Sequence, residues 1–122
     1  MEAKKIIITG GATRIGAAIA KSLAGYDIKI SIPEFSCVCP RTGLPDFATI
    51  KINYIPNKHI VELKSLKLYI VQFRNIGIFH EHVTNKILDD IKRAIKPRKI
   101  EVFGVFNARG GIQTTVESSW EE

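Results

Sequence analysis

The sequence predicts an α+β domain in which one antiparallel sheet carries two helices on a single face. Three observations lead to this class. Two apolar-alternating segments come first, a stretch with helical periodicity follows, and two further alternating segments end the chain. From Tyr26 onward the predicted order is therefore ββααββ. Strands that flank a helical pair in this way can join into one sheet with the helices as a second layer.

The first two strands are expected at Tyr26–Ile32, resuming at Phe35–Cys39 after an interruption at Pro33-Glu34, and at Asp46–Tyr54. Apolar and polar residues alternate along each of them, as they do in a half-buried strand. The sequence Pro40-Arg41-Thr42-Gly43 predicts a turn between the two.

Two helices are expected next, at Leu66–Arg74 and His80–Ile95, separated by Asn75-Ile76-Gly77. The second has an apolar stripe at helical spacing, formed by Val83, Ile87, Ile91 and Ala94-Ile95. Pro97 ends it. The last two strands are predicted at Ile100–Phe106 and Ile112–Glu117, joined by a turn at Arg109-Gly110-Gly111.

Residues 1–25 have a different pattern, which predicts a short β-turn-α appendage. Ile6-Ile7-Ile8 is expected to be a strand, Gly10-Gly11 a tight turn and Ile15–Leu23 a short helix. The segment Thr9–Gly16 resembles the phosphate-binding turn of the short-chain dehydrogenase family. A dinucleotide fold needs several more βα units, so residues 1–25 are not expected to be a complete domain.

Composition bounds the function without naming it. The 122 residues fit one domain, and the net charge of +6 implies an anionic partner: nucleic acid, a phosphorylated cofactor or an acidic lipid surface. No basic run with interleaved aromatic residues is present, and no segment is long enough to span a membrane. Cys37 and Cys39, two residues apart, are expected to be reduced thiols in a cytoplasmic protein.

Two places in the sequence could carry chemistry. Glu62 falls at the predicted start of a helix, and Lys64 and Lys67 lie three residues apart on nearly one helical face, which suits a multiply charged anion such as a dinucleotide phosphate. The alternative is a solvated charged face with a helix cap. Cys39 lies where a strand meets a turn, so it is either a partly exposed reactive thiol or an inert buried one.

The stretch Glu62-Leu63-Lys64-Ser65-Leu66-Lys67-Leu68-Tyr69 resembles the signature of the QueF family, the NADPH-dependent 7-cyano-7-deazaguanine reductases of queuosine biosynthesis, a tRNA modification. Further family motifs stand in the same order: Cys39–Thr49, Phe73-Arg74-Asn75, Phe79-His80-Glu81, Pro97-Arg98 and Arg109-Gly110-Gly111. The resemblance runs from about Tyr26 to about Thr114. It implies that residues 26–122 form a reductase domain of the tunnelling fold, whose subunits close into homo-oligomeric rings, commonly two stacked pentamers.

The resemblance also implies the roles of single residues. Cys39 attacks the nitrile carbon to form a covalent thioimide, Asp46 supplies a proton to the nitrile nitrogen, and His80 lies over the reacting group. For Asp46 alone, a turn aspartate that caps backbone amides is the other interpretation. The implied substrate-binding residues are Val61, Glu62, Leu63, Phe79, His80 and Glu81, with Glu62 contributed by a neighbouring subunit.

The implied cofactor is NADPH, with Lys64, Ser65, Lys67, Arg109 and Gly110 as its binding residues. The expected reaction converts 7-cyano-7-deazaguanine and two NADPH to 7-aminomethyl-7-deazaguanine. The expected substrate is thus a small 7-deazapurine nitrile. The protein is expected to have no metal site, no membrane association and no direct nucleic-acid partner.

Three alternatives remain at this stage. One is a zinc-dependent, pterin-type cyclohydrolase of the same fold that uses Cys37, Cys39 and a histidine as ligands. Another is the archaeosine-type relative that transfers ammonia to the nitrile on tRNA without NADPH. The third is an inactive fusion remnant that acts only as a binding module, which the dehydrogenase-like start of the chain suggests.

Overall fold

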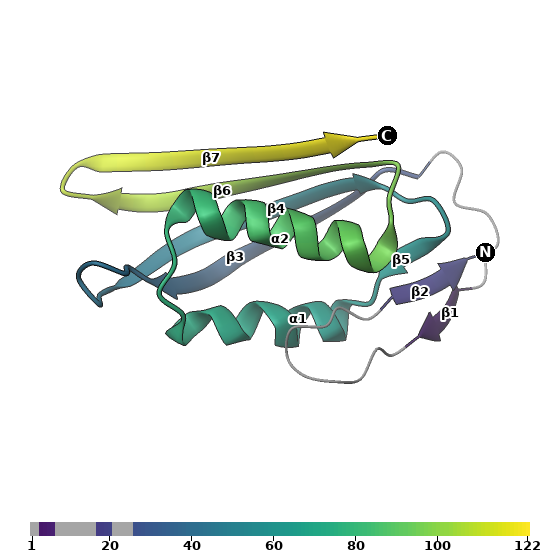
Figure 1. Cartoon of the computed structure of the whole chain (residues 1–122), viewed down its shortest axis with the longest axis horizontal. Helices are drawn as coiled ribbons and strands as arrows, with labels where there is room; N and C mark the ends of the chain where they lie inside the picture. The colour runs from purple at the N-terminus through teal and green to yellow at the C-terminus, as the bar shows by residue number, and fades with distance from the viewer. Residues whose placement is uncertain (1–2, 7–16, 21–25) are drawn as a thin grey trace.

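A computed structural model describes residues 3–6, 17–20 and 26–122 of the chain. Its main element is a four-stranded antiparallel sheet in the order β3–β4–β6–β7 (Figure 1). The strands are β3 (Ile28–Val38), β4 (Pro45–Ile55), β6 (Lys99–Arg109) and β7 (Ile112–Glu121). β3 and β7 are the two outer strands of this sheet, so each has one edge that no strand of the same sheet covers.

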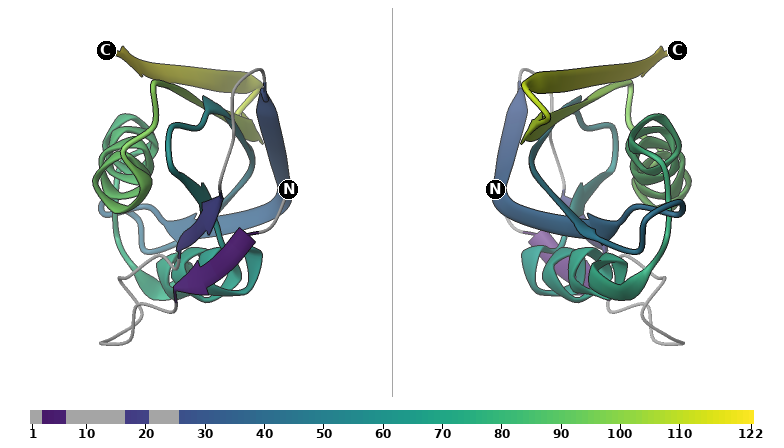
Figure 2. Two further views of the ribbon diagram at one scale, coloured as in Figure 1. Left: turned by 90° about the vertical axis from the view of Figure 1, so that its right-hand side faces the viewer. Right: turned by 90° about the vertical axis from the view of Figure 1, so that its left-hand side faces the viewer.

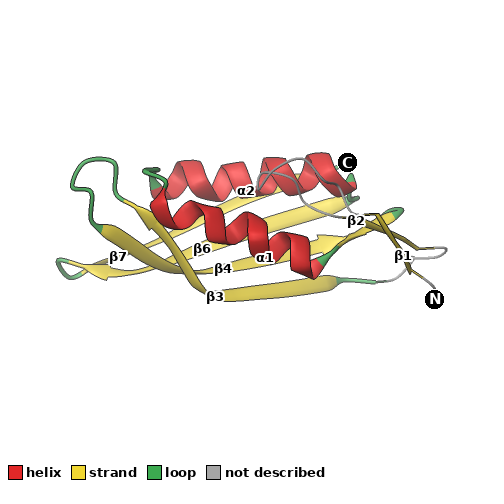
Figure 3. Cartoon of the chain, turned by 90° about the horizontal axis from the view of Figure 1, so that it is seen from below, coloured by secondary structure: helices red, strands yellow, loops and turns green. Residues whose placement is uncertain are grey.

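Two helices lie on one face of the sheet (Figure 3). They are α1 (Leu63–Val71), which continues into the 3₁₀ helix η1 (Gln72–Asn75), and α2 (His80–Ile95). The end views show α1 below β3 and α2 beside the part of the sheet that holds β6 and β7 (Figure 2). The predicted ββααββ order and α+β class are confirmed.

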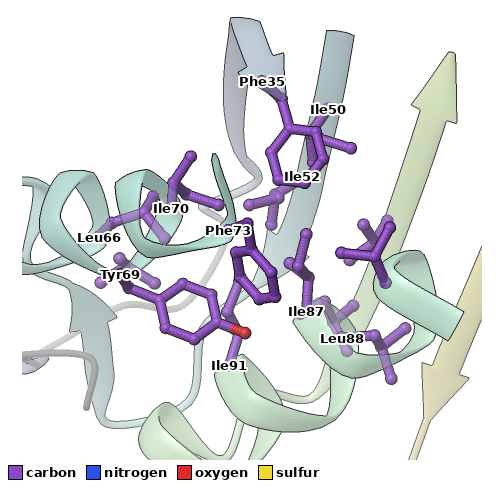
Figure 4. Close-up of a cluster of buried hydrophobic side chains, with 14 of the residues drawn as sticks. Phe35, Ile50, Ile52, Leu66, Tyr69, Ile70, Phe73, Ile87, Leu88 and Ile91 are labelled. Atoms are coloured by element: carbon purple, nitrogen blue, oxygen red, sulfur yellow. The ribbon is translucent and has the colours of Figure 1, made fainter. Parts of the chain in front are cut away.

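The hydrophobic core fills the space between the sheet and the helices (Figure 4). The apolar stripe predicted for the second helix is confirmed, because Val83, Ile87, Ile91 and Ile95 are completely buried. Along β4 every second residue from Asp46 to Tyr54 is buried, as the alternation predicted. Tyr69 joins the two helices: its hydroxyl donates a hydrogen bond of 2.5 Å to the Asp90 carboxylate.

Several predicted boundaries differ from the structure: β3 begins at Ile28, β6 extends to Arg109 and β7 extends to Glu121, and two further differences have a clear physical cause. β3 is not interrupted at Pro33-Glu34; its ladder with β4 shifts register between Ile32 and Phe35 and then continues, which is a β-bulge. α1 begins at Leu63 and not at Leu66, because the Glu62 side chain accepts a hydrogen bond of 2.6 Å from the backbone N–H of Ser65 and so caps the helix.

The helix predicted at Ile15–Leu23 is wrong for residues 17–20, which form a strand. β1 (Ala3–Ile6), β2 (Ala17–Ala20) and β5 (His59–Val61) make a second, three-stranded antiparallel sheet in the order β1–β2–β5. Alanine prefers a helix by less than about 1 kcal/mol per residue, and a short helix has a costly nucleus, so pairing with the edge of β5 overrides the preference. The predicted Gly10-Gly11 turn lies outside the described residues.

Neither α1 nor α2, the helices in the described part of the chain, has the length and apolar character needed to cross a bilayer.

Candidate active site

The candidate site lies at the end of the sheet where the turn after β3, the turn after β6 and the start of α2 come together (Figure 1). A cavity of about 330 Å³ opens there. Side chains from all three segments line it: Cys39, Pro40, Thr42, Asp46, Phe79, His80, Glu81 and Arg109. Six of these were candidates from the sequence, namely Cys39, Asp46, Phe79, His80, Glu81 and Arg109.

Cys39 is placed by a tight turn and by a backbone clamp. Its N–H donates to the Leu44 carbonyl and its carbonyl accepts from the Gly43 N–H, both at 2.9 Å. Gly43 has a φ of +72°, a left-handed conformation that favours glycine. The preceding residue, Val38, exchanges two backbone hydrogen bonds of 3.0 Å with Ile76 and Ile78. These two bonds of Val38 hold the turn that begins at Cys39 against the segment that leads into α2.

The surroundings of the Cys39 sulfur favour the thiolate. The Thr42 hydroxyl and the backbone amides of Thr42 and Arg41 hydrogen-bond to the sulfur and lower the pKa of the thiol below its ordinary value. Sequence reasoning placed Thr42 in the motif without giving it a role. A hydroxyl three residues after a cysteine in a Pro-Arg-Thr-Gly turn is the signal that could have identified it.

Cys37 has the opposite environment. It is fully buried on β3, directly across from Asp46 of β4, and its Sγ lies 4.0 Å from the Ile78 carbonyl oxygen. Burial first, then the negative charge of Asp46, raises the pKa of this thiol to about 11. Cys37 is therefore a buried thiol, and it does not line the cavity with Cys39.

Asp46 is the electrostatic centre of the site. Only 7% of its surface is exposed, and its carboxylate contacts two cationic or ionisable side chains. Its Oδ2 lies 3.2 Å from Nε2 of His80, and its Oδ1 lies 3.3 Å from Nε of Arg109. Arg109 also donates a hydrogen bond to the Pro45 carbonyl. A nearly buried carboxylate is costly unless it is paired, so these contacts explain how Asp46 can face the cavity.

Phe106 also belongs to this environment and was not predicted from the sequence. Its ring stacks on the imidazole of His80, with centroids 3.8 Å apart and an interplanar angle of 8°. Phe106 lies on β6, far from His80 in the chain, so no local pattern points to the contact. In the sequence it was only the last residue of a predicted strand.

Apart from Gly110, the other predicted site residues belong to the segment 61–67, which begins at the opposite end of the sheet. Tyr54, eight residues beyond Asp46 on β4, accepts at its hydroxyl oxygen a hydrogen bond of 3.0 Å from the Val61 N–H. Eight residues of antiparallel strand span about 27 Å, so Val61 and Glu62 are distant from the cavity. The same segment carries four further members of the predicted substrate and cofactor sets: Leu63, Lys64, Ser65 and Lys67.

The predicted cofactor residues are therefore divided within one chain. Lys64 and Lys67 are exposed on α1, whereas Arg109 and the exposed Gly110 lie at the turn beside the cavity. Two exposed ammonium groups on one helix face have the chemistry to bind phosphate oxygens. The guanidinium of Arg109 is already engaged by Asp46. The residues thus fit a phosphorylated cofactor, but a single chain does not bring all of them to one place.

Among the described residues, no group of three or more His, Cys, Asp or Glu side chains is arranged to hold a metal ion.

Fold and cavity together define a class of protein: an α+β domain with a cysteine, a carboxylate and a histidine gathered at one end of an antiparallel sheet. A family model described as QueF-like protein matches residues 45–122. The chain is 60% identical over 96 residues to the NADPH-dependent 7-cyano-7-deazaguanine reductase of Chloroherpeton thalassium, covering 79% of this chain and 83% of the relative. The chain belongs to the QueF family.

A second relative supports this assignment, and a solved structure shares the fold. The reductase of the same description from Thermomicrobium roseum is 57% identical over 96 residues, which is 79% of this chain and 75% of that protein. Among solved structures, the apo form of the archaeosine synthase QueF-Like superposes with a TM-score of 0.72 over 76% of this chain and 91% of that one. Its sequence identity is 20%, so this likeness concerns the fold alone.

Proposed function

We propose that the chain is an NADPH-dependent 7-cyano-7-deazaguanine reductase that forms 7-aminomethyl-7-deazaguanine, a step of queuosine biosynthesis, with residues 26–122 as the reductase domain. The observation that carries the proposal is a thiol with a lowered pKa that shares one cavity with a nearly buried carboxylate and a histidine. The names of relatives that are 55–60% identical support the substrate and the cofactor.

In the proposed reaction the Cys39 thiolate attacks the nitrile carbon, so that a C–S bond forms and one C–N π bond breaks. Negative charge then grows on the nitrile nitrogen. Asp46, once it carries the thiol proton, donates it to that nitrogen, and the product is a neutral thioimide. His80 keeps Asp46 oriented through the 3.2 Å contact, and Arg109 holds the other carboxylate oxygen.

Glu81 is the proposed recognition residue for the heterocycle. It is exposed in the first turn of α2, at the cavity that Cys39 lines. A carboxylate is acceptor-only when ionised, which suits the adjacent N–H donors of an amino-pyrimidinone edge. Phe79 offers a half-exposed aromatic face beside it for the ring system.

Two molecules of NADPH would each supply one of the two hydrides that reduction of a nitrile to an amine requires. Lys64 and Lys67 are the proposed phosphate-binding residues, with Ser65 beside them and Arg109-Gly110 as the contribution from the cavity side.

The complete site is proposed to form between copies of the chain. Tyr54, which bonds to the residue before Glu62, lies about 27 Å along β4 from Asp46, so we propose that the Glu62 that meets a given Cys39 comes from another copy. Apart from Val38, which bonds to the segment before α2, the outer edge of β3 is not paired within the four-stranded sheet, and neither is the outer edge of β7. These edges can pair with neighbouring copies, which favours a closed ring.

The first test uses 7-cyano-7-deazaguanine without NADPH and the intact mass of the protein. The native chain and the Cys37→Ala control should gain one substrate mass, and Cys39→Ala should gain none. NADPH consumption should then follow with the same substrate. No adduct in a correctly assembled protein would refute the reductase assignment. An adduct that never consumes NADPH, together with tRNA binding, would favour the ammonia-transfer alternative.

The second test addresses the shared site. Cys39→Ala and Glu62→Gln chains should each be inactive, but a refolded mixture should regain activity, because about one quarter of randomly formed sites combine two intact halves. A mixture that stays inactive while its oligomeric state matches the native protein would show that each chain builds its own site.

A further inference from the structure

The His80 imidazole is held by groups from two different strands. At one edge of the ring, Nε2 lies 3.2 Å from the carboxylate of Asp46 on β4. Against one face lies the ring of Phe106 on β6, nearly parallel at 8° and 3.8 Å between centroids. A quarter of the His80 side-chain surface is exposed, on the side that lines the cavity. Phe106 itself is only 1% exposed, so its ring is held in place by the surrounding core.

Gly104, two residues before Phe106 on β6, explains the position of the Phe106 ring. A Cβ added at Gly104 would lie 2.8 Å from Cε2 of Phe106 and 2.7 Å from Oγ1 of Thr84. Both distances are shorter than real contacts of a Cβ atom, so any larger residue would displace the Phe106 ring, the Thr84 side chain or both. Thr84 is completely buried and donates a hydrogen bond of 2.9 Å to the His80 carbonyl, so it has no free space to enter.

We propose that Phe106 and Gly104 are positioning residues that hold the His80 imidazole in the orientation in which Nε2 faces Asp46. The χ2 torsion of histidine has broad minima, so the ring plane of a partly exposed histidine is not set by its own backbone. The flat ring of Phe106 against one face of the imidazole removes that freedom. Because Gly104 has no side chain, the Phe106 ring can occupy the position that it needs for this contact. The catalytic consequence rests on the proposed function: a displaced His80 would leave Asp46 poorly oriented toward the substrate nitrogen.

The orientation of the ring can be tested without substrate. The Phe106 ring current should shift the His80 ring protons upfield in the NMR spectrum, and a His80→Asn variant assigns those signals among the three histidines of the chain. Phe106→Leu should abolish the upfield shift, and Gly104→Ala should reduce it. Phe73→Leu is the matched control, because Phe73 is equally buried in the same core but packs against Phe35 and Tyr69. His80 signals that are the same in Phe106→Leu and in the native chain would overturn the proposal.

The catalytic consequence is measured as the rate at which the Cys39 adduct forms. Small displacements of a reacting group cost up to about 100-fold in rate, so we expect Phe106→Leu and Gly104→Ala to be about 10-fold to 100-fold slower than Phe73→Leu at equal folded fraction. Equal rates would overturn the positioning role. If the native protein forms no adduct at all, the proposed function fails, and the NMR comparison alone decides whether Phe106 and Gly104 orient His80.

Discussion

Cys37 and Cys39 should react with iodoacetamide at very different rates in the folded protein, although they are two residues apart. Cys39 lines an open cavity, and hydrogen bonds from Thr42 and the turn amides lower its pKa below the ordinary value of 9.0. Cys37 is fully buried, and its pKa is raised to about 11. Since the thiolate is the nucleophile, both differences favour alkylation of Cys39.

The size of the difference follows from the thiolate fractions. A pKa of about 11 in place of 9.0 lowers the thiolate fraction of Cys37 at neutral pH about 100-fold. A more basic thiolate is also a better nucleophile, with a Brønsted slope of about 0.4–0.5. The higher pKa therefore raises the intrinsic reactivity of the Cys37 thiolate about 10-fold, which offsets part of the roughly 100-fold loss in thiolate fraction. Ionisation alone therefore predicts at least about a 10-fold preference for Cys39. The burial of Cys37 increases it further, because the reagent reaches that sulfur only when the structure opens.

The assay is intact-mass spectrometry of Cys37→Ala and Cys39→Ala, each of which retains one thiol, during alkylation from pH 6 upward. The rate for Cys39 should rise with pH and level off with a midpoint below pH 9.0, the direction in which its pKa is shifted. In urea the two variants should react alike, which controls for the reagent. Equal rates in the folded state, or a Cys39 midpoint above pH 9.0, would refute the description of the two environments.

Three further predictions concern other groups. Asp46→Asn should slow adduct formation about 10²–10⁴-fold, the usual contribution of a general acid; an unchanged rate with native melting behaviour would exclude Asp46 as the proton donor. Tyr69→Phe should lower the free energy of unfolding by about 1–2 kcal/mol in urea titrations, because the bond to Asp90 is lost while Lys86 still pairs with that carboxylate. Lys96 ends α2 with a φ of +46°, so Lys96→Gly should raise the melting temperature, with a gain of about 1 kcal/mol; a decrease would contradict this.

Much of the fold was predictable because its signals are local. Both ends of α2, His80 and Ile95, were predicted at the residues where the structure has them. Val83, Ile87 and Ile91 mark one face of the helix, and Pro97 follows its end. β4 was predicted almost as closely from strict alternation. These patterns depend only on neighbouring residues and on which face meets the core.

The errors arose where partners are distant in the sequence. Ala17–Ala20 has good helix formers, but its backbone pairs with β5, about forty residues later. The bulge at Pro33-Glu34 keeps β3 continuous where the sequence predicted a break.

The site was predictable to a similar extent. The motifs identified Cys39, Asp46 and His80, and the structure brings these three to one cavity. The contacts that orient them were not predictable, because the Arg109–Asp46 pair and the His80–Phe106 stack join elements that no spacing rule connects. The catalytic, substrate-binding and cofactor-binding roles of all the predicted site residues stay predictions.

The distance between the Cys39 cavity and Glu62 has a consequence for how the protein should behave in solution. If a working site needs both ends of the sheet, catalysis is linked by mass action to the association of chains, and specific activity should fall when the protein is diluted below its dissociation constant. The linkage is reciprocal: a ligand that contacts two copies must also tighten their association, so substrate should restore assembly at concentrations where the ligand-free protein falls apart. Substrate supply would then set the amount of active enzyme as well as its rate.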